Sequence, residues 1–441
     1  MRTALKFCLP SLLGVFAFLV PIRWDGDLTI PVGVLTGWVN DQLAPVGLEI
    51  VVAVTIITTI FTVLGSWLRP DWLRSRAWLR QLFDVSWIWV LIRLLGAVFG
   101  LMYLLQFGPE ILQSDSLAGV VFLDIGFNVL MIYLVASFLL PLLTDYGFME
   151  FVGTLARPIF RRVFRLPGRS AVDATTSIVS ASSVGLLITI QQYDRGFYST
   201  RQACTVATNF SIISIPFSLV VADASGIAEW FVPWYGIVFL ATLIAAMITP
   251  RLPPLAGKSD TEYRGQKPFE ESRDRESLLS IAWTRATQRA AQAPGLVGLI
   301  ALGARNLMFF VFTVTAAAMA LATLSALVTF ETPLFVWLSA PLVGVLELAG
   351  LPEAAAAAPG LFSGFLDQFT PAVIAAGIES ERTSFVLAGL SVTQLVFLSE
   401  AGVIILRSNL PLTLLDLLAI FLLRTAIVLP ILIAGAHWII P

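Results

Sequence analysis

The sequence has little charge for its length. Asp, Glu, Lys and Arg make up 13% of 441 residues, whereas a soluble domain would carry about 25%. One histidine and two cysteines, Cys8 and Cys204, provide no cluster of transition-metal ligands. The net charge of −2 gives no basic surface for nucleic acid. His437 has no Ser-His-Asp motif around it, and there is no P-loop. We therefore expect no enzyme and no bound cofactor or metal.

Apolar residues are abundant instead. They make up 57% of the chain, and the mean hydropathy is +0.87. A helix needs about 20 apolar residues to cross the bilayer core. Runs of that kind lie near 4–22, 45–68, 85–107, 117–143, 202–222, 233–250, 305–328, 384–406 and 412–440. The pattern predicts an all-α polytopic membrane protein with about nine transmembrane helices, including a first span that is retained because no signal-peptide cleavage site follows it.

Two polar passages interrupt this apolar sequence in a similar order. Residues 157–220 and 340–406 each contain a proline, a Leu-Pro pair, a stretch of small and polar residues, and an arginine at the start of a polar helix. The matching residues are Pro158 and Pro341, Leu166-Pro167 and Leu351-Pro352, and Arg201 and Arg382. This order predicts an internal repeat, each copy with one re-entrant hairpin and one broken helix.

The distribution of Lys and Arg predicts how the copies enter the membrane. Basic residues concentrate near 69–80, 157–169 and 251–289, which should be cytoplasmic. The segment 331–353 carries glutamates and no Lys or Arg, and should be external. We therefore predict two inverted repeats with a site at the midplane. The expected domains are 1–143 (N-terminal transmembrane helices), 144–250 (first repeat; hairpin near 171–192, broken helix near 202–222), 251–292 (cytosolic linker ending in an interfacial helix), and 293–441 (second, inverted repeat; hairpin near 353–378, helix near 384–406).

Polar side chains in these passages are the candidate ligands. Non-helical backbone at membrane depth survives only beside a cavity or inside protein, and free N–H groups at a helix start can hold an oxygen of a solute. The predicted solute-binding residues are Thr176, Ser180, Ser182, Ser183, Asn209, Ser211, Ser363, Gln368, Ser391 and Gln394. Pro216 should break the helix after Asn209 and free carbonyls near 211–213. Carboxylates at membrane depth are functional candidates, so Asp367 and Glu400 are predicted to bind a coupling ion, H⁺ or Na⁺.

Structural explanations stay open for several of these residues. Small residues can serve close helix packing alone. Asp367 could cap a helix, and Glu400 could pair with Arg407 or reach headgroups. The other charged residues in spans are explained by ion pairs or snorkelling, and are left out of the site: Arg93, Asp124, Asp416 and Arg424.

The stretch LPGRSAVDATTSIVSASSVGLLITIQQYDRGFYSTRQACTVATNFSIISIPFSLVVAD resembles the YjiH-type bacterial inner-membrane proteins, which contain a nucleoside-recognition, or Gate, domain. The opening LKFCLPSLLGVFAFLVPI is also similar to that family. The resemblance implies a multi-pass protein of the bacterial inner membrane. It does not fix the substrate, because related Gate segments occur in nucleoside carriers, ferrous-iron transporters and sporulation membrane proteins.

Together these features predict a secondary transporter with its N-terminus in the cytoplasm, moving a small polar solute by alternating access. The hydroxyl and amide groups would suit a nucleoside or an amino-acid-like solute, and Asp367 with Glu400 would suit a cation such as an amine or a guanidinium. The alternative is a membrane scaffold or sensor that packs the same residues without a solute. The expected partners are the solute and the lipid bilayer, with no nucleic acid, and a homo-oligomer stays open.

Overall fold

The long apolar segments form helices in the computed structural model, which describes residues 2–20, 22–24, 27–179, 182–211, 215–260 and 277–440. In this part of the chain, six helical segments are long and apolar enough to cross a membrane: Pro31–Leu68, Trp87–Leu105, Glu110–Thr144, Ala228–Arg251, Leu296–Glu331 and Leu414–Ile439. Shorter apolar helices accompany them. The predicted α-helical membrane architecture is confirmed, and the count of nine stays a prediction.

The chain folds into two units, and the second unit combines residues 31–138 with 296–338. Its core is the packing of α3 against α6 and of α6 against α16. The elements are α2 (Pro31–Leu43), η1 (Ala44–Val46), α3 (Gly47–Val63), η2 (Leu64–Leu68), α4 (Asp71–Arg74), α5 (Ala77–Phe83), α6 (Trp87–Leu105), η3 (Glu110–Leu112), η4 (Asp115–Phe127), most of α7 (Asn128–Thr144), α15 (Leu296–Phe310), η10 (Val311–Thr315) and α16 (Ala316–Glu331).

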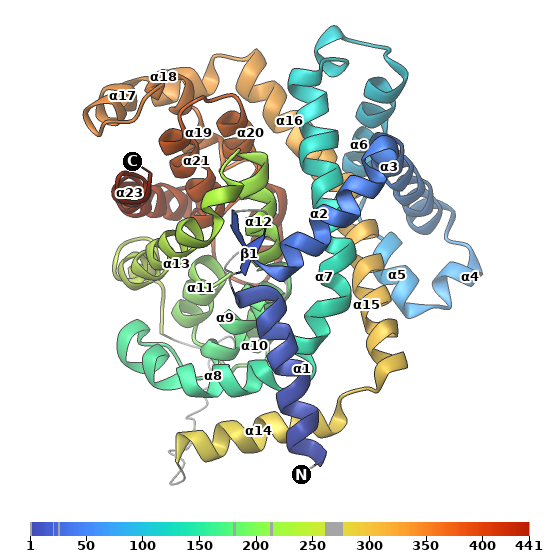
Figure 1. Cartoon of the computed structure of the whole chain (residues 1–441), viewed down its shortest axis with the longest axis vertical. Coiled ribbons are helices and arrows are strands. Elements are labelled where there is room, and N and C mark those ends of the chain that lie inside the picture. Colours follow the sequence, from blue (N-terminus) through green and yellow to red (C-terminus); the bar gives the residue numbers. More distant parts are fainter. Residues whose placement is uncertain are drawn as a thin grey trace. The chain divides into compact units, whose positions relative to one another are not determined.

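The first unit holds both polar passages of the sequence. It consists of residues 1–30, 139–295 and 339–441, and Figure 1 labels its elements. They begin with α1 (Arg2–Leu19), β1 (Ile22–Trp24), β2 (Asp27–Thr29), α8 (Phe148–Ile159), η5 (Phe160–Phe164), α9 (Ser170–Val179), α10 (Ser182–Asp194), α11 (Thr200–Asn209), α12 (Ile215–Ala224), η6 (Ala228–Trp230), α13 (Phe231–Ile248), η7 (Thr249–Arg251), η8 (Leu255–Gly257) and α14 (Leu278–Gln292). They continue with α17 (Leu334–Leu348), α18 (Ala354–Ala357), α19 (Gly360–Ser363), α20 (Thr370–Ala376), α21 (Glu381–Thr393), η11 (Leu398–Gly402), α22 (Val403–Arg407) and α23 (Leu414–Ile439).

Two details depart from the expected helices. The residues after α1 form a short antiparallel pair, β1 with β2, so the fold is not purely helical. The expected loop between the first two spans contains α2, which the acidic residues around it concealed. The predicted spans 202–222 and 384–406 are each interrupted, as expected for broken helices: α11 ends at Asn209 and α21 at Thr393, where polar residues favour a helix end over a continuous ladder.

The two polar passages share local structure as well as sequence order. A residue with positive φ stands directly before each Leu-Pro pair: Arg165 (φ 55°) and Gly350 (φ 74°). The following leucines are both 4% exposed. Serine caps the next long helix in each passage, Ser199 for α11 and Ser380 for α21. These shared turns and caps explain why the same order of residues occurs twice.

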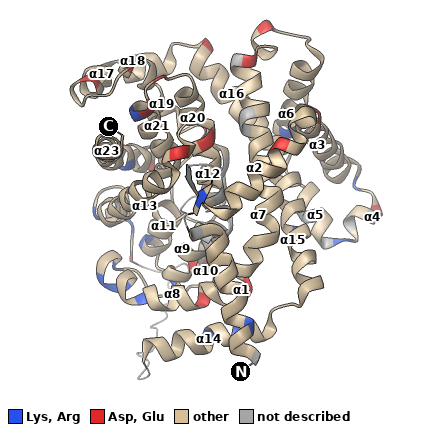
Figure 2. Ribbon diagram, viewed as in Figure 1, with Lys and Arg blue, Asp and Glu red and all other residues tan. Residues whose placement is uncertain are grey.

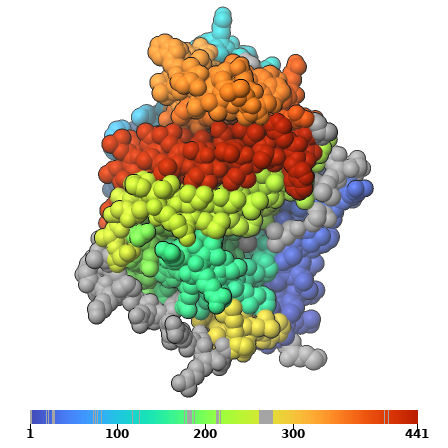
Figure 3. Space-filling view, turned by 90° about the vertical axis from the view of Figure 1, so that its left-hand side faces the viewer, coloured from blue at the N-terminus to red at the C-terminus, as the bar shows by residue number. Residues whose placement is uncertain are grey.

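The arginines at the starts of α11 and α21 reach different helices. Arg201 donates to the carbonyl of Pro250 at the end of α13 (3.4 Å). Arg382 donates to the carbonyl of Ile440, just after α23 (3.2 Å). α13 and α23 pack side by side, and Figure 3 shows them as neighbouring bands across one face of the first unit.

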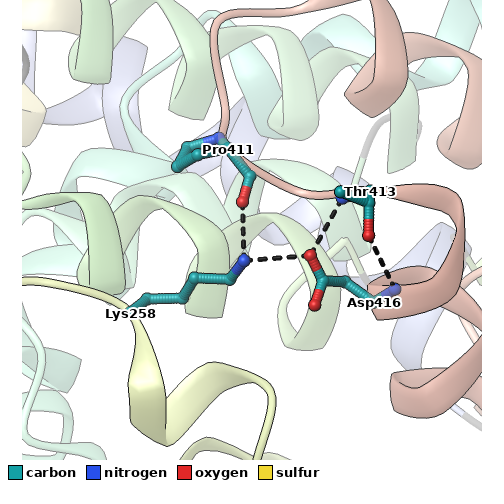
Figure 4. A network of polar contacts seen from close by, with 4 residues as sticks. All are labelled: Lys258, Pro411, Thr413 and Asp416. Atoms are coloured by element: carbon teal, nitrogen blue, oxygen red, sulfur yellow. Dashed lines mark hydrogen bonds and ion pairs between the residues drawn. The ribbon is translucent and has the colours of Figure 1, made fainter.

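A polar network ties the beginning of α23 to the segment after α13 (Figure 4). Lys258 Nζ donates to the carbonyl of Pro411 (2.7 Å) and pairs with Asp416 Oδ2 (2.9 Å). Asp416 also accepts the N–H of Thr413 (2.9 Å) and completes a capping box at the start of α23. The expected ion pair of Asp416 is confirmed. The N–H of Arg201 in α11 donates to the carbonyl of Ser259 (3.0 Å), next to Lys258 and the beginning of α23, whereas Arg382 of α21 contacts the other end of α23. α11 and α21 therefore begin at opposite ends of this helix.

Charged residues of opposite sign also lie in different parts of the first unit. Figure 2 shows basic residues on and around α8, whereas the charged residues of α17 and of the turn before α18 are the glutamates Glu347 and Glu353. α14 packs on α8 and α1 through a stripe of buried alanines, Ala282, Ala286 and Ala290. Leu279 and Trp283, close to this stripe on the helix, stay partly exposed, and the ring of Trp283 also contacts Phe7 of α1 (centroids 5.5 Å apart). An interfacial position of α14 stays a prediction. Which side of the membrane each end faces stays a prediction.

Replacing Lys258 with Met should lower the free energy of unfolding by about 1–2 kcal/mol, because a charge-assisted bond is lost from a largely buried pair. Both side chains are 19% exposed. The measurement is thermal unfolding of the purified protein in detergent. The matched control is Arg69→Met, which removes a pair with Asp84 at 4.0 Å whose side chains are 58% and 36% exposed, and which should change stability by less than about 0.5 kcal/mol. Equal effects would contradict the structural role of Lys258.

Candidate functional site

Two helices of the first unit end inside the protein rather than at its surface. α11 ends at Asn209 and α21 ends at Thr393, and the residues at both ends are buried. The last carbonyls of a helix lack intrahelical donors and lie at the negative end of its dipole. Each of these ends therefore needs hydrogen-bond donors from elsewhere in the structure.

Arg424, from the middle of α23, donates to one oxygen at each of these ends, a backbone carbonyl of α21 and a side-chain amide oxygen of α11. Its side chain is fully buried. Nε and Nη2 donate to the carbonyl of Thr393 (3.1 and 2.7 Å), and Nη1 donates to Asn209 Oδ1 (2.8 Å). The amide nitrogen of Asn209 donates to Thr205 O (3.2 Å) and Thr208 Oγ1 (3.0 Å). Asn209, predicted as a solute ligand, therefore holds Arg424 in this arrangement.

Gln394 follows α21 and contacts the second hairpin. Its Nε2 donates to the carbonyl of Leu361 (3.0 Å) and to Thr425 Oγ1 (2.9 Å). Its Oε1 faces Gly364, where a Cβ would overlap this oxygen. A glycine at this position thus allows the hairpin backbone to approach the amide.

The neighbouring hairpin residues bring further polar groups to α21. Ser391 Oγ donates to the carbonyl of Gln368. Ser363, Gln368 and Gln394 are each at most 7% exposed. Ser363 Oγ, Gln368 Oε1 and Gln394 Oε1 have no hydrogen-bond partner among the residues that the structure describes. A buried polar atom without a partner costs about 1–3 kcal/mol, so these three atoms are suited to bind donors of a solute.

Asp367 is 3% exposed, and its Oδ2 accepts the backbone N–H of Phe369 (2.9 Å) at the turn before α20. This bond lies within the turn, and α20 has no side-chain cap of its own, so the helix-capping explanation for Asp367 is not confirmed. An ion-coupling role for Asp367 stays a prediction. The side chain of Glu400 lies outside the described residues, and so does that of Arg407, its proposed partner.

In the first passage, α9 and α10 form a hairpin. Ser180 and residues 212–214 lie outside the described residues, as do the side chains of three other candidates, Thr176, Ser182 and Ser183. Ser211 is 3% exposed, and its hydroxyl donates to the carbonyl of Ala207 (2.8 Å). The candidate ligands of the two passages are therefore described unequally, and the second hairpin with α21 defines the site.

Asp173 is a residue of this hairpin that the sequence analysis missed. It lies in the first turn of α9 and is 1% exposed. Its Oδ2 accepts hydrogen bonds from Tyr198 Oη (2.7 Å) and Thr189 Oγ1 (3.2 Å). The carboxylate thus joins the two helices of the hairpin to the segment that leads into α11. The sequence feature that could have identified Asp173 is that it is a single acidic residue in a polar stretch without other charges.

Arg424 was also missed, and the explanation by snorkelling or an ion pair is wrong for Arg424 and Arg93. Both are at most 2% exposed. Arg93 donates to Thr62 Oγ1 (2.7 Å) and to the carbonyl of Leu82 (3.0 Å). The sequence feature that could have identified both arginines is a charged residue near the centre of an apolar helix, which is a functional candidate by default.

The fold and this buried polar centre define a polytopic α-helical membrane protein whose polar groups gather where helices break. A family model described as Gate, nucleoside recognition, matches residues 126–228, which include Asp173 and Asn209. The predicted Gate domain is thereby confirmed. The chain belongs to the same family as the protein named Uncharacterized protein BpOF4_10220 of Alkalihalophilus pseudofirmus, with 41% identity over 435 residues, 98% of this chain and 94% of that protein.

Solved structures with a similar course of the chain include those of CNTnw. The structure titled as CNTnw in an inward-facing substrate-bound state has a TM-score of 0.41 and 13% identity, over 92% of this chain and 97% of that chain. A variant of CNTnw in an outward-facing state has a TM-score of 0.44 and 12% identity, over 99% of this chain and 98% of that chain.

Proposed function

We propose that this protein is a secondary transporter that moves a small polar solute, either nucleoside-like or amino-acid-like, across the membrane by alternating access. The observation that carries the proposal is the set of three buried, unpaired atoms: Ser363 Oγ, Gln368 Oε1 and Gln394 Oε1. They come from the second hairpin and the end of α21 in an otherwise apolar protein. A solute with O–H or N–H donors would satisfy them.

The chemistry of these groups favours a nucleoside over a charged amine. An amide oxygen and a hydroxyl bind neutral donors such as sugar hydroxyls and base amino groups. The Gate match, described as nucleoside recognition, supports the same class. A full positive charge on the solute would be disfavoured by the nearby guanidinium of Arg424.

The placement of α11 and α21 supports alternating access. The two helices begin at opposite ends of α23 and end near its middle, at Arg424. α23 has 26 residues, about 39 Å at the usual rise per residue, which is enough to cross a bilayer. A site between helix ends that approach from opposite sides can be exposed to either side in turn. Coupling to H⁺ or Na⁺ through Asp367 and Glu400 is part of the proposal.

Replacing Ser363 with Ala should weaken solute binding about tenfold, because one hydrogen bond to the solute is lost. Stability should not fall, since Ser363 Oγ gives up no bond to a described residue. The measurement is thermal stabilisation of the purified protein by purine and pyrimidine nucleosides, free bases, ribose and amino acids, followed by uptake into proteoliposomes with and without Na⁺ and pH gradients. A ligand that binds only the folded state raises the midpoint.

The matched control is Ser211→Ala, because Ser211 Oγ, just after α11, is already bonded to the carbonyl of Ala207 in that helix. That variant should keep wild-type affinity. If no solute stabilises a well-folded wild-type protein, or if both serine variants bind alike, the site does not bind the solute as proposed. The first result would favour the scaffold alternative, in which the same polar groups only pack.

A further inference from the structure

The carboxyl ends of α11 and α21 converge on one side chain. The carbonyl of Thr393 and Oδ1 of Asn209 both point at the guanidinium of Arg424. All three residues are buried. The two oxygens belong to half-helices that enter from opposite ends of α23. The negative ends of two helix dipoles therefore lie close together inside the first unit.

Oxygens of this kind ordinarily attract a free cation. In transporters with broken helices, unwound carbonyls and half-helix carboxyl ends coordinate Na⁺, and hard cations prefer carbonyl and amide oxygens. In this chain the oxygens bind a guanidinium instead. Arg424 is long enough to reach from α23, and its planar fork lets two nitrogens bind the same carbonyl while a third binds the amide.

We infer that Arg424 is a resident cation, which occupies the place between the ends of α11 and α21 where a free monovalent cation would otherwise bind. The charge is covalently attached and permanent. The junction is thus stabilised in the same way whether Na⁺ is present or absent. If the proposed transport function holds, on which this consequence rests, solute binding does not require Na⁺ at this junction, and coupling falls to other groups.

The test replaces the tethered cation with one from solution. Arg424→Ala should lower the midpoint of thermal unfolding by on the order of 10 °C, because it leaves the buried carbonyl of Thr393 and the buried amide oxygen of Asn209 without their donor. Methylguanidinium or Na⁺, added to a few tens of millimolar at constant ionic strength with choline as the filler, should restore several degrees by binding the folded state. Wild-type protein measured in parallel corrects for general salt effects. Arg424→Ala combined with Asn209→Leu should lose the response, because one of the two ligand oxygens is gone.

No solute is added in this experiment, so its outcome is separate from that of the proposed function. An Arg424→Ala protein that gains no cation response, or a double variant that keeps it, would overturn the inference. If Arg424→Ala does not fold, Arg424→Lys and Arg424→Met decide the question. The lysine variant should fold and the methionine variant should not. Equal stability of the two would show that the stem of Arg424 matters and its charge does not.

Discussion

Replacing Gly96 with Ala should destabilise the second unit by on the order of 3 kcal/mol, at the upper end of what overpacking costs. Gly96 lies on α6, where a Cβ would overlap the carbonyl oxygen of Ala316 and lie 3.2 Å from its carbonyl carbon. Backbone atoms cannot move aside as a flexible side chain can. The two helices would have to separate, and membrane helices depend on such close approach for their packing. The measurement is the fraction of monodisperse protein that survives a temperature series in detergent.

Gly37, on α2 of the same unit, provides the matched control. A Cβ at this position meets no atom within 4 Å. Gly37→Ala should therefore raise stability by about 0.5–1 kcal/mol, because alanine favours a helix over glycine. The two identical substitutions should have effects of opposite sign. Two small changes of the same sign would mean that α6 and α16 do not pack as described.

The second large effect concerns the base of the first hairpin. Asp173→Ala should cost about 3 kcal/mol, because it leaves the hydroxyl of Tyr198 buried without its acceptor and takes from Thr189 one of its two acceptors, the other being the carbonyl of Gly185. Tyr198→Phe should cost about 1–2 kcal/mol. In the double variant the two losses should not add, and the coupling energy should reach about 1 kcal/mol or more. Unfolding of the four proteins in the same detergent gives this cycle.

A second tyrosine–aspartate pair makes the control for this cycle. Tyr103 Oη donates to Asp115 Oδ1 at 2.8 Å, but Asp115 is exposed. Water can replace the lost partner there, so the coupling energy of the Tyr103→Phe and Asp115→Ala cycle should be well below that of the hairpin. Similar values for the two cycles would show that burial of Asp173 adds nothing to the bond.

The fold was predictable where it depends on long apolar runs. The apolar composition alone predicts α-helices that cross a bilayer. The predicted span 412–440 matches α23 almost to its ends. Periodicity could not show that α16, from the second half, packs with α6, because tertiary pairing of apolar helices leaves no pattern in either sequence. The acidic residues around α2 made it look like a loop, although its apolar residues suffice for a helix.

The site was predictable as a set of residues but not as a set of contacts. The polar interruptions located Gln394, Gln368 and Ser363 correctly in one neighbourhood. Arg424 was set aside because a single arginine in an apolar span has a common explanation in snorkelling. Only its partners, Asn209 and Thr393 on two other helices, show that it points inward. Asn209 is 215 residues and Thr393 is 31 residues from Arg424 in the sequence, so no local rule connects them.

The contacts of α23 also set an order of assembly. Arg424 is 215 residues beyond Asn209 and Asp416 is 158 beyond Lys258, so both earlier partners leave the ribosome long before the helix that they bind. Contacts over such distances form slowly. During that interval the broken end of α11 stays without its donor in the membrane. A nascent chain is therefore open to chaperones and proteases until α23 inserts, and cellular quality control would act on the incomplete first unit.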